Sequence, residues 1–217
     1  MNHHIVLFGD SIFDNKSYVG GELDVINHLR QKMPADWQAT LRAVDGSIVE
    51  NVQRQTLDLP ADATHLFISV GGNNALLNAD VLQMNVSSSA EVFDRLADLA
   101  TEFEHHYREM LQAVLKLDKP TTVCTIYYPR MSDDFAQKVT VAALATFNDV
   151  IIRQAFLANV PLIDLRLVCT EDADYANDIE PSEAGGGKIA ETILRVVNEH
   201  NFEANRTEVY FYGQTNS

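Results

Sequence analysis

The stretch that decides the fold reads His-Ile-Val-Leu-Phe-Gly-Asp-Ser-Ile and covers residues 4–12. Its first part, His4–Phe8, lacks the polar–apolar alternation of a half-buried strand, and Gly9, Asp10 and Ser11 follow it directly. A short run of this kind is typical of a strand that is buried on both faces, as in a parallel sheet. The glycine predicts a tight turn after the strand. We therefore expect Ser11 at the carboxyl end of that strand.

The same succession of strand and helix recurs along the chain. The predicted strands are His4–Phe8, Trp37–Val44, His65–Val70, Pro120–Tyr128 and Val160–Leu165. The predicted helices are Gly21–Met33, Ser47–Leu57, Ala90–Leu117, Asp133–Asn159 and Ser182–His200, with Ser47 and Ser182 as N-caps. Five alternations favour one α/β domain over residues 1–200, with a parallel sheet and helices on both faces. In the tail, residues 201–217, Glu208–Tyr212 has the pattern of a short strand that could join a sheet edge or a second subunit.

The composition and net charge of the chain argue against some classes of binding partner. The chain has 217 residues, of which 46% are hydrophobic, and a formal net charge of −15 at pH 7. Such an acidic surface repels a phosphate backbone, which argues against nucleic acid. The two cysteines are too few for a disulfide framework, no apolar run approaches the roughly 18 residues of a membrane span, and no signal-peptide pattern opens the chain. We expect a cytoplasmic protein that acts on a small molecule without a cofactor, in an oligomeric state that the sequence does not indicate.

Three polar segments that contain glycine follow predicted strands, at residues 9–11, 45–47 and 71–74. The carboxyl ends of parallel strands meet at one edge of the sheet, and such sheets bind their ligands there. The backbone N–H groups of Ser11 and Gly46 and the side-chain amide of Asn73 could therefore converge beside the Ser11 hydroxyl. This is the donor set that stabilises the oxyanion of an acyl-transfer reaction.

These segments resemble the sequence blocks of the SGNH branch of the GDSL hydrolases. Phe8-Gly9-Asp10-Ser11 is similar to the first block, whose serine is the nucleophile, and Gly46 is similar to the glycine of the second. Gly71-Gly72-Asn73-Asn74 is similar to the third block, Gly-x-Asn-Asp, with Asn74 in place of the usual aspartate. The resemblance extends from about residue 4 to residue 200.

The resemblance implies a flavodoxin-like three-layer α/β/α sandwich with a five-stranded parallel sheet. It implies that Ser11 is the nucleophile and that Ser11, Gly46 and Asn73 are the oxyanion donors. It also implies a serine hydrolase that acts on a carboxylic ester, in the manner of an esterase or lipase.

The last block departs from the family's pattern. That block is typically Asp-x-x-His, often followed by proline, whereas this chain reads Asn177-Asp178-Ile179-Glu180-Pro181. With the prolines aligned, Glu180 takes the place of the histidine and Asn177 that of the aspartate, and a shift of one residue does not restore the pair. The histidines of the chain lie at the amino ends of predicted strands, inside predicted helices or at a helix end, away from this edge: His3, His4, His28, His65, His105, His106 and His200.

Two interpretations of this block remain open. In the first, Glu180 is the general base for Ser11, a role that a carboxylate can perform if burial raises its pKa toward neutrality. Serine peptidases of the sedolisin type resemble this pairing. Asn177 fits it, because a neutral amide can donate a hydrogen bond to a carboxylate that an aspartate would repel. In the second, the acid–base machinery is lost and the fold binds an acyl or glycan ligand without cleaving it. Other chemistry, including catalysis on a metal, also stays open.

Three further patterns receive a structural interpretation. The acidic residues between Glu171 and Glu180 do not match the calcium-loop spacing and are interpreted as a solvated loop. Residues 185–188, Gly-Gly-Gly-Lys, lack the spacing of a phosphate-binding loop and are interpreted as close packing of a helix on the sheet. Residues 76–89 are expected to border the pocket, where their apolar side chains suggest an acyl chain.

Overall fold

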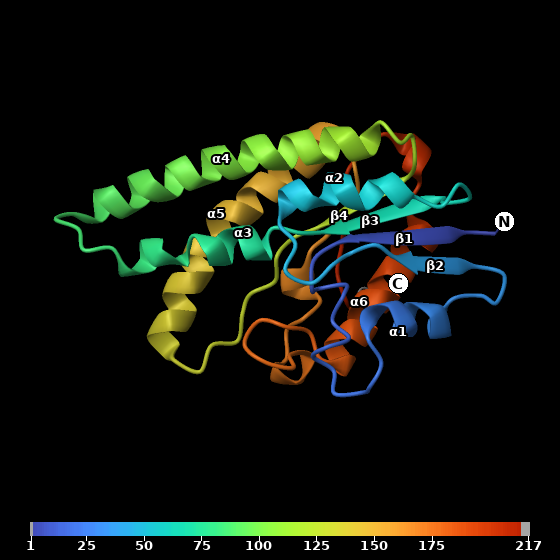
Figure 1. Ribbon diagram of the computed structural model, residues 1–217, viewed down its shortest axis with the longest axis horizontal. Helices are drawn as coiled ribbons and strands as arrows, with labels where there is room; N and C mark the ends of the chain where they lie inside the picture. The colour runs from blue at the N-terminus through green and yellow to red at the C-terminus, as the bar shows by residue number, and fades with distance from the viewer. Residues whose placement is uncertain (1, 214–217) are drawn as a thin grey trace.

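Six parallel strands form one sheet in the order β2-β1-β3-β4-β5-β6 (Figure 1). The computed structural model describes residues 2–213. The strands are β1 His4–Gly9, β2 Gln38–Leu41, β3 His65–Ser69, β4 Thr121–Cys124, β5 Leu162–Ile163 and β6 Val209–Tyr210. The helices are α1 Val25–Lys32, α2 Val52–Gln55, α3 Gly72–Leu77, α4 Ser89–Leu115, α5 Asp134–Ala158 and α6 Glu183–Glu199. The predicted fold class, a parallel sheet between two layers of helices, is confirmed.

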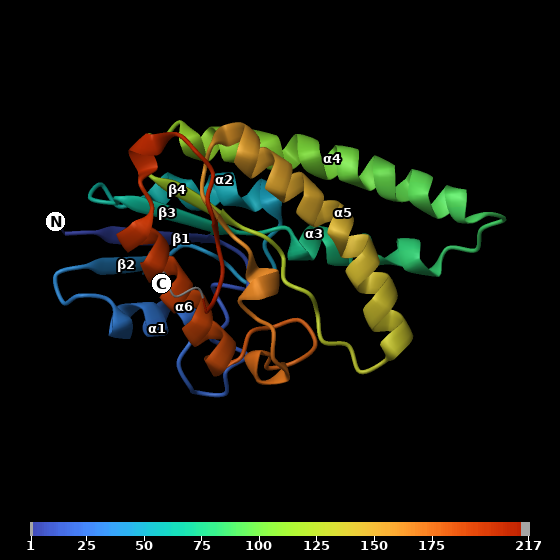
Figure 2. The ribbon, with the colours of Figure 1, turned by 180° about the vertical axis from the view of Figure 1, so that it is seen from behind.

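Strand β1 lies between β2 and β3 and faces both hydrophobic cores. Ile5 and Leu7 belong to the core under α1 and α6, whereas Val6 and Phe8 belong to the core under α2, α4 and α5. All six residues of β1 are buried, which explains why the strand shows no alternation of polar and apolar residues. Figures 1 and 2 show the two helix layers on opposite faces of the sheet.

The sheet has one strand more than the five expected. The additional strand, β6, comes from the C-terminal tail and pairs in parallel with β5, so the tail joins the sheet edge. The last four residues of the predicted tail lie outside the described part of the chain. The sequence predicted a short strand at Glu208–Tyr212 but left its partner open, because the pairing depends on where the sheet edge lies.

Strand β4 is shorter than the predicted Pro120–Tyr128, and its end leads into the candidate site. The backbone N–H of Ile126 donates to Oδ1 of Asn148 over 2.8 Å, and its carbonyl accepts from Nδ2 of the same side chain over 2.8 Å. Asn148 belongs to α5 and is fully buried. A side-chain amide thus replaces the neighbouring strand at this point, which ends the ladder.

The segment predicted as a helix from Ser47 to Leu57 is instead a short α-helix, α2, between two 3₁₀ turns. Ser47 does not cap it, because the Ser47 hydroxyl accepts a hydrogen bond from Nε2 of Gln55 over 3.2 Å. The predicted cap of the last helix is confirmed: the Ser182 hydroxyl accepts from the N–H of Gly185 over 3.2 Å. Helix α3 and the 3₁₀ turn after it, Ala79–Gln83, were not predicted.

Helices α4 and α5 extend well beyond the carboxyl edge of the sheet (Figures 1 and 2). Helix α4 has 27 residues and spans about 40 Å, whereas β1 has six residues and spans about 20 Å. By length and composition alone, α5 could cross a membrane, although no apolar run of that length was expected. In this fold its apolar side chains, among them Phe147, Val150 and Ile151, pack in the core beside α4.

At the end of β1, Gly9 allows two strand backbones to approach more closely than any other residue would permit. Its φ is +126°, and a Cβ added there would lie 1.8 Å from the carbonyl oxygen of Ser69 at the end of β3. The next N–H, that of Asp10, donates to the same carbonyl over 3.1 Å. The turn that leads to Ser11 therefore depends on the missing side chain of Gly9.

We expect Gly9→Ala to lower the free energy of unfolding by more than about 3 kcal/mol or to prevent folding, because the clash with backbone adds to the strain of a positive φ. The matched control is Gly20→Ala. Gly20 also has a positive φ, of +61°, but an added Cβ would meet nothing within 4 Å, so we expect a loss of only about 1–2 kcal/mol. Denaturant unfolding measures both, and equal losses would contradict the close approach.

Candidate active site

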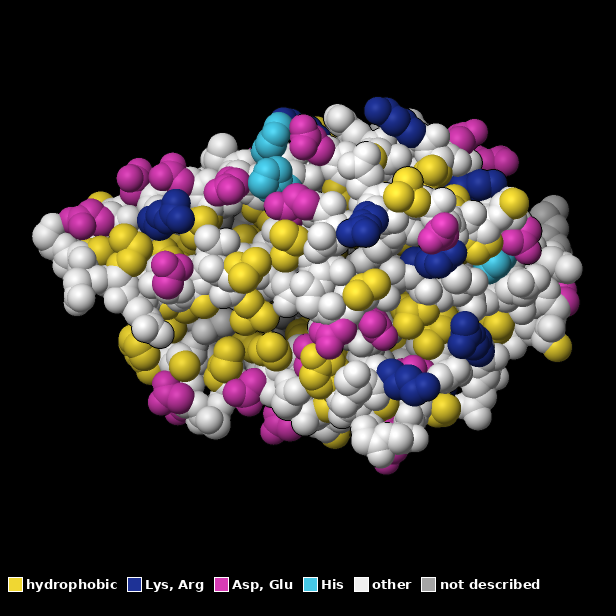
Figure 3. Space-filling model, viewed as in Figure 1, with side chains coloured by type: hydrophobic (Ala, Val, Ile, Leu, Met, Phe, Trp, Pro, Cys, Tyr) yellow, Lys and Arg dark blue, Asp and Glu magenta, His cyan; other side chains and the backbone are white. Residues whose placement is uncertain are grey.

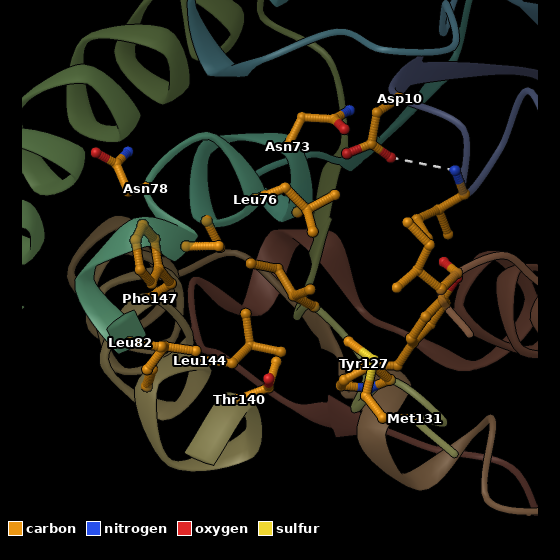
Figure 4. Close-up of a pocket in the computed structure, with 18 of the residues that line it drawn as sticks. Asp10, Asn73, Leu76, Asn78, Leu82, Tyr127, Met131, Thr140, Leu144 and Phe147 are labelled. Carbon is orange, nitrogen blue, oxygen red and sulfur yellow. Dashed lines mark hydrogen bonds between the residues drawn. The ribbon is translucent and has the colours of Figure 1, made fainter. Parts of the chain in front are cut away.

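A pocket of about 150 Å³ opens at the carboxyl edge of the sheet. Its walls come from the turn after β1, from α3 and the turn after it, from α4, from the segment between β4 and α5, from α5 itself, and from the loop before α6. In Figure 3 hydrophobic side chains gather around a hollow in the half of the molecule where the helices pass the sheet. Figure 4 shows Asp10 and Asn73 at one end of the pocket and Phe147 and Leu82 at the other.

Ser11 and Glu180 meet at this pocket. The Ser11 hydroxyl donates a hydrogen bond of 3.0 Å to Oε1 of Glu180, although the two residues are 169 positions apart in sequence. Both side chains are buried and both line the pocket. The second oxygen of Glu180, Oε2, is buried and has no hydrogen-bond partner among the described residues. A carboxylate in this position can accept the hydroxyl proton on Oε1, and its Oε2 remains available to accept another hydrogen bond.

Three consecutive carbonyl groups hold the backbone around Glu180. The carbonyl of Ile179 accepts from the Tyr127 hydroxyl over 2.6 Å, and that of Glu180 from the N–H of Ala176 over 2.8 Å. The carbonyl of Pro181 accepts from Nδ2 of Asn15 over 3.1 Å. This backbone has little freedom to shift, so the Glu180 carboxylate keeps its place opposite Ser11.

Asn15 connects the two halves of the Ser11–Glu180 pair. It is fully buried and lies four residues after Ser11. Its Oδ1 accepts the N–H of Val25 over 2.9 Å, at the start of α1, while its Nδ2 donates to Pro181. One amide side chain thereby ties the segment that follows the hydroxyl to the segment that carries the carboxylate.

Two buried carboxyl groups flank Ser11, and both have raised pKa values. Burial raises the pKa of Glu180 to about 7; the hydrogen bond from Ser11 opposes this shift and the charge of Asp45 adds to it. Burial also raises the pKa of Asp10 to about 7, against the hydrogen bond that its carboxylate accepts from the N–H of Ile12. The negative charge of Glu180 adds to the shift of Asp10. A carboxyl group with a pKa near 7 can both accept and donate a proton at neutral pH.

Of the three predicted oxyanion donors, Ser11 and Asn73 line the pocket and Gly46 does not. The N–H groups of Ser11 and Gly46 donate no hydrogen bond within residues 2–213. The Asn73 amide donates to the carbonyl of Ser47 over 2.9 Å, which ties the loop of Gly46 to α3. The same loop is held from the other side, where Oδ2 of Asp14 accepts the N–H of Asp45 over 3.0 Å.

Asn177 does not contact the Glu180 carboxylate in the described structure, although the sequence suggested a donated hydrogen bond. Its side-chain oxygen instead accepts the backbone N–H groups of Ile179 and Glu180, over 2.9 and 3.0 Å. Asn177 is exposed and lines a neighbouring cavity beside Arg130. It shapes the turn that presents Glu180.

No histidine is among the residues that line the Ser11 pocket in the part of the chain that the structure describes. His28, for example, is buried between α1 and α6, where its Nε2 lies 3.1 Å from Oε1 of Glu183. Within residues 2–213, no group of three or more histidine, cysteine and acidic side chains is arranged to hold a metal ion.

The acidic loop before α6 is not wholly solvated as expected. Asp174 is buried, and its carboxylate accepts the N–H groups of Thr170 and Glu171 and pairs with the Lys188 ammonium at 2.8 Å. The glycine run at 185–187 packs closely, but against the loop and α1 and not against the sheet as predicted: a Cβ on Gly185 would lie 2.2 Å from the carbonyl oxygen of Asp174, and one on Gly186 would lie 3.3 Å from the side chain of Val25. The acidic loop and the start of α6 thus pack closely together on either side of Glu180 in the sequence.

The sequence matches a known protein family. A sequence model described as the GDSL-like Lipase/Acylhydrolase family matches residues 7–186. A search of curated protein sequences finds no match.

Several solved structures share the fold at low sequence identity. The chain is similar to an acetyl xylan esterase, AlAXEase, with 16% identity, a TM-score of 0.65, and coverage of 89% of this chain and 99% of that one. It is similar to a member of the lipolytic G-D-S-L family from Veillonella parvula, with 16% identity, a TM-score of 0.66, and coverage of 91% and 100%. It is also similar to the lipase/acylhydrolase from Enterococcus faecalis, with 16% identity, a TM-score of 0.64, and coverage of 98% and 100%.

The raised pKa of Asp10 predicts a pH-dependent cost in stability. A carboxyl group with a pKa near 4 when unfolded and about 7 when folded binds more protons in the folded protein between these values, so stability falls as the pH rises through that window. We expect Asp10→Asn to remove this loss while its amide oxygen still accepts the N–H of Ile12. The melting temperature of the variant relative to the unmodified chain should rise from pH 4.5 to pH 8, by roughly 2–4 °C for each kcal/mol recovered. A difference independent of pH would show that Asp10 ionises normally.

Proposed function

The chain belongs to the GDSL-like lipase/acylhydrolase family, and from this we propose that it hydrolyses a small-molecule carboxylic ester through an acyl-enzyme on Ser11, with Glu180 as the general base. The observation that carries the proposal is the buried hydrogen bond of 3.0 Å from the Ser11 hydroxyl to the Glu180 carboxylate, in the wall of a pocket. The esterases and lipases of the same fold support ester hydrolysis in general, at identities too low to indicate a substrate.

In the first half of the reaction, Ser11 Oγ attacks the ester carbonyl carbon while Glu180 takes the hydroxyl proton. The carbonyl π electrons move to oxygen, which gives a tetrahedral oxyanion. When this intermediate collapses, the bond to the alcohol breaks and the protonated Glu180 returns its proton to the leaving oxygen. The alcohol departs, and the acyl group remains on Ser11.

In the second half, a water molecule replaces the alcohol. Glu180, again ionised, takes a proton from this water as its oxygen attacks the acyl carbon. Collapse of the second tetrahedral intermediate releases the acid and returns the proton to Ser11 Oγ. The unpartnered Oε2 of Glu180 gives the carboxylate a free acceptor for that water while Oε1 faces Ser11.

The oxyanion needs donors that are already in place. In this proposal the free N–H of Ser11 and the second amide hydrogen of Asn73 supply them from the pocket wall, and the free N–H of Gly46 does so from the adjoining loop, which does not line the pocket. The hydrogen bond from Asn73 to Ser47 fixes the amide plane and brings the loop of Gly46 toward α3, which supports this assignment.

We expect wild-type protein to turn over a short-chain chromogenic ester, and expect Ser11→Ala and Glu180→Gln each to lower kcat by at least about a thousandfold. Glu180→Gln keeps the size of the side chain but removes the basic carboxylate. Glu183→Gln is the control, because it removes a carboxylate of the same segment that does not line the pocket. We expect kcat/KM of the wild type to rise with pH along a limb near pH 7, since the base works only when ionised and burial raises the pKa of Glu180 to about 7.

Each failure of this experiment has a different meaning. Full activity of Glu180→Gln would refute the carboxylate base, and full activity of Ser11→Ala would remove the acyl-enzyme. A wild type that binds the ester but never turns it over would favour the alternative function, a module that holds an acyl or glycan ligand without cleaving it.

Asn73 gives a separate prediction. If its amide stabilises the oxyanion, Asn73→Ala should lower kcat by roughly a hundredfold or more and change KM little, because the donor acts mainly in the transition state. The neighbouring Asn74→Ala is the control: Asn74 accepts the N–H of Val49 over 3.1 Å and does not line the pocket. A variant of Asn73 that loses affinity but keeps its turnover number would place the residue in ground-state binding.

A further inference from the structure

The pocket has an apolar part that the chemistry at Ser11 does not use. Its walls there are aliphatic and aromatic side chains from α3, the turn after it, α4 and α5: Leu76, Val81, Leu82, Leu96, Leu144 and Phe147. Figure 4 shows this part leading away from Asp10, past Leu76, toward Leu82 and Phe147. Phe147 is buried and stacks edge-on against Phe103 at 5.0 Å, so that end is backed by the core.

This part of the pocket exists because the long helices pass the end of the sheet. Where α4 and α5 overhang, they have no strands to cover their inward faces (Figures 1 and 2). The apolar faces of the overhanging segments instead meet α3 and the turn after it, and the pocket lies between them. An apolar space that opens at a nucleophile favours an apolar group attached to the reacting carbonyl.

The size of the pocket limits the length of that group. A cavity of about 150 Å³ lined by leucine, isoleucine and phenylalanine in another protein stays dry and binds benzene, a molecule of six carbons. The pocket here has about the same volume, with leucine and phenylalanine side chains around its apolar part and Asp10, Ser11 and Glu180 at its polar end. An acetyl group would leave most of it empty, and a chain of twelve carbons would have to extend out of it.

We propose that the substrate is an ester of a medium-chain acid of about six carbons, whose acyl chain lies between α3, α4 and α5 with its end against Phe147. This rests on the proposed function, because it places the acyl carbon at Ser11. The alcohol then leaves on the side of Glu180, which must give it a proton. The side chains of α5 that line the pocket set the limit on chain length.

The test is kcat/KM for p-nitrophenyl esters of two to twelve carbons. We expect a rise of about fourfold for each methylene, roughly two-hundredfold from acetyl to hexanoyl, followed by a plateau or fall. Ala143→Leu adds bulk to a residue of α5 that lines the pocket, and should move the optimum to shorter chains. Its control is Ala142→Leu, which makes the same change at the exposed neighbour and should leave the profile unaltered.

A second variant works in the opposite direction. Phe147→Leu shortens the side chain at the closed end with less loss of packing than alanine would cause, and should move the optimum to longer chains. Wild-type protein that hydrolyses acetyl as well as hexanoyl esters would overturn the inference while leaving the proposed function intact. The inference would also be overturned if Ala143→Leu and Phe147→Leu both left the dependence of kcat/KM on chain length unchanged.

Binding separates the two proposals if no ester is turned over. Calorimetry then measures the affinity of the wild-type protein for hexanamide and acetamide, which are uncharged analogues of the two acyl groups. Their relative affinities test whether the pocket binds a medium-chain acyl group. Tighter binding of hexanamide, lost in Ala143→Leu and kept in Ala142→Leu, would support the acyl pocket although hydrolysis had failed. Equal affinity for the two amides would overturn it.

Discussion

The site depends on the close contact between the ends of two central strands. Gly9 at the end of β1 lies against the carbonyl of Ser69 at the end of β3, at a distance that excludes any side chain. The contact turns the chain sharply, buries Asp10 and brings the Ser11 hydroxyl to the edge of the sheet. The side-chain amide of Gln55 completes the arrangement, because it bonds both the N–H and the carbonyl of Gly9, each over 2.8 Å. Ser11, the proposed nucleophile, thus stands at the end of a central strand, and the helices and loops that line the pocket are arranged around it.

The parts of this molecule that depend on local sequence pattern could be predicted. The uniform burial of β1, the parallel sheet and the pairing of Ser11 with Glu180 follow from a run of residues, from the order of elements and from one altered block. The roles of Asn15 and Tyr127 could not be found in this way, because each hydrogen-bonds a backbone group that is more than 50 positions away. The sequence offered only weak evidence for the role of Asn15, which is a polar residue four positions after Ser11.

The same limit applies to the electrostatics and to the pocket. Nothing in the acidic run before α6 distinguishes Asp174, which is buried and paired with Lys188, from its exposed neighbours. The raised pKa of Asp10 depends on burial, which only the packed structure supplies. Helix length was predicted well for α4 and α5, but the pocket between them follows from how far they pass the sheet. That distance is a property of the assembled layers and not of either helix.

A carboxylate base changes how charge moves during the proposed reaction. A neutral imidazole that takes the serine proton creates two charges, an imidazolium and an oxyanion, which the protein must separate and stabilise. An ionised Glu180 that takes the same proton becomes neutral while the oxyanion forms, so one negative charge simply migrates across the bond being made. The number of charges stays constant, and little dipole has to be built in surroundings of low polarity. An apolar, partly closed pocket such as the one beside Ser11 is therefore compatible with the chemistry, and the hydrogen bond between Ser11 and Glu180 lies along the path of that migrating charge.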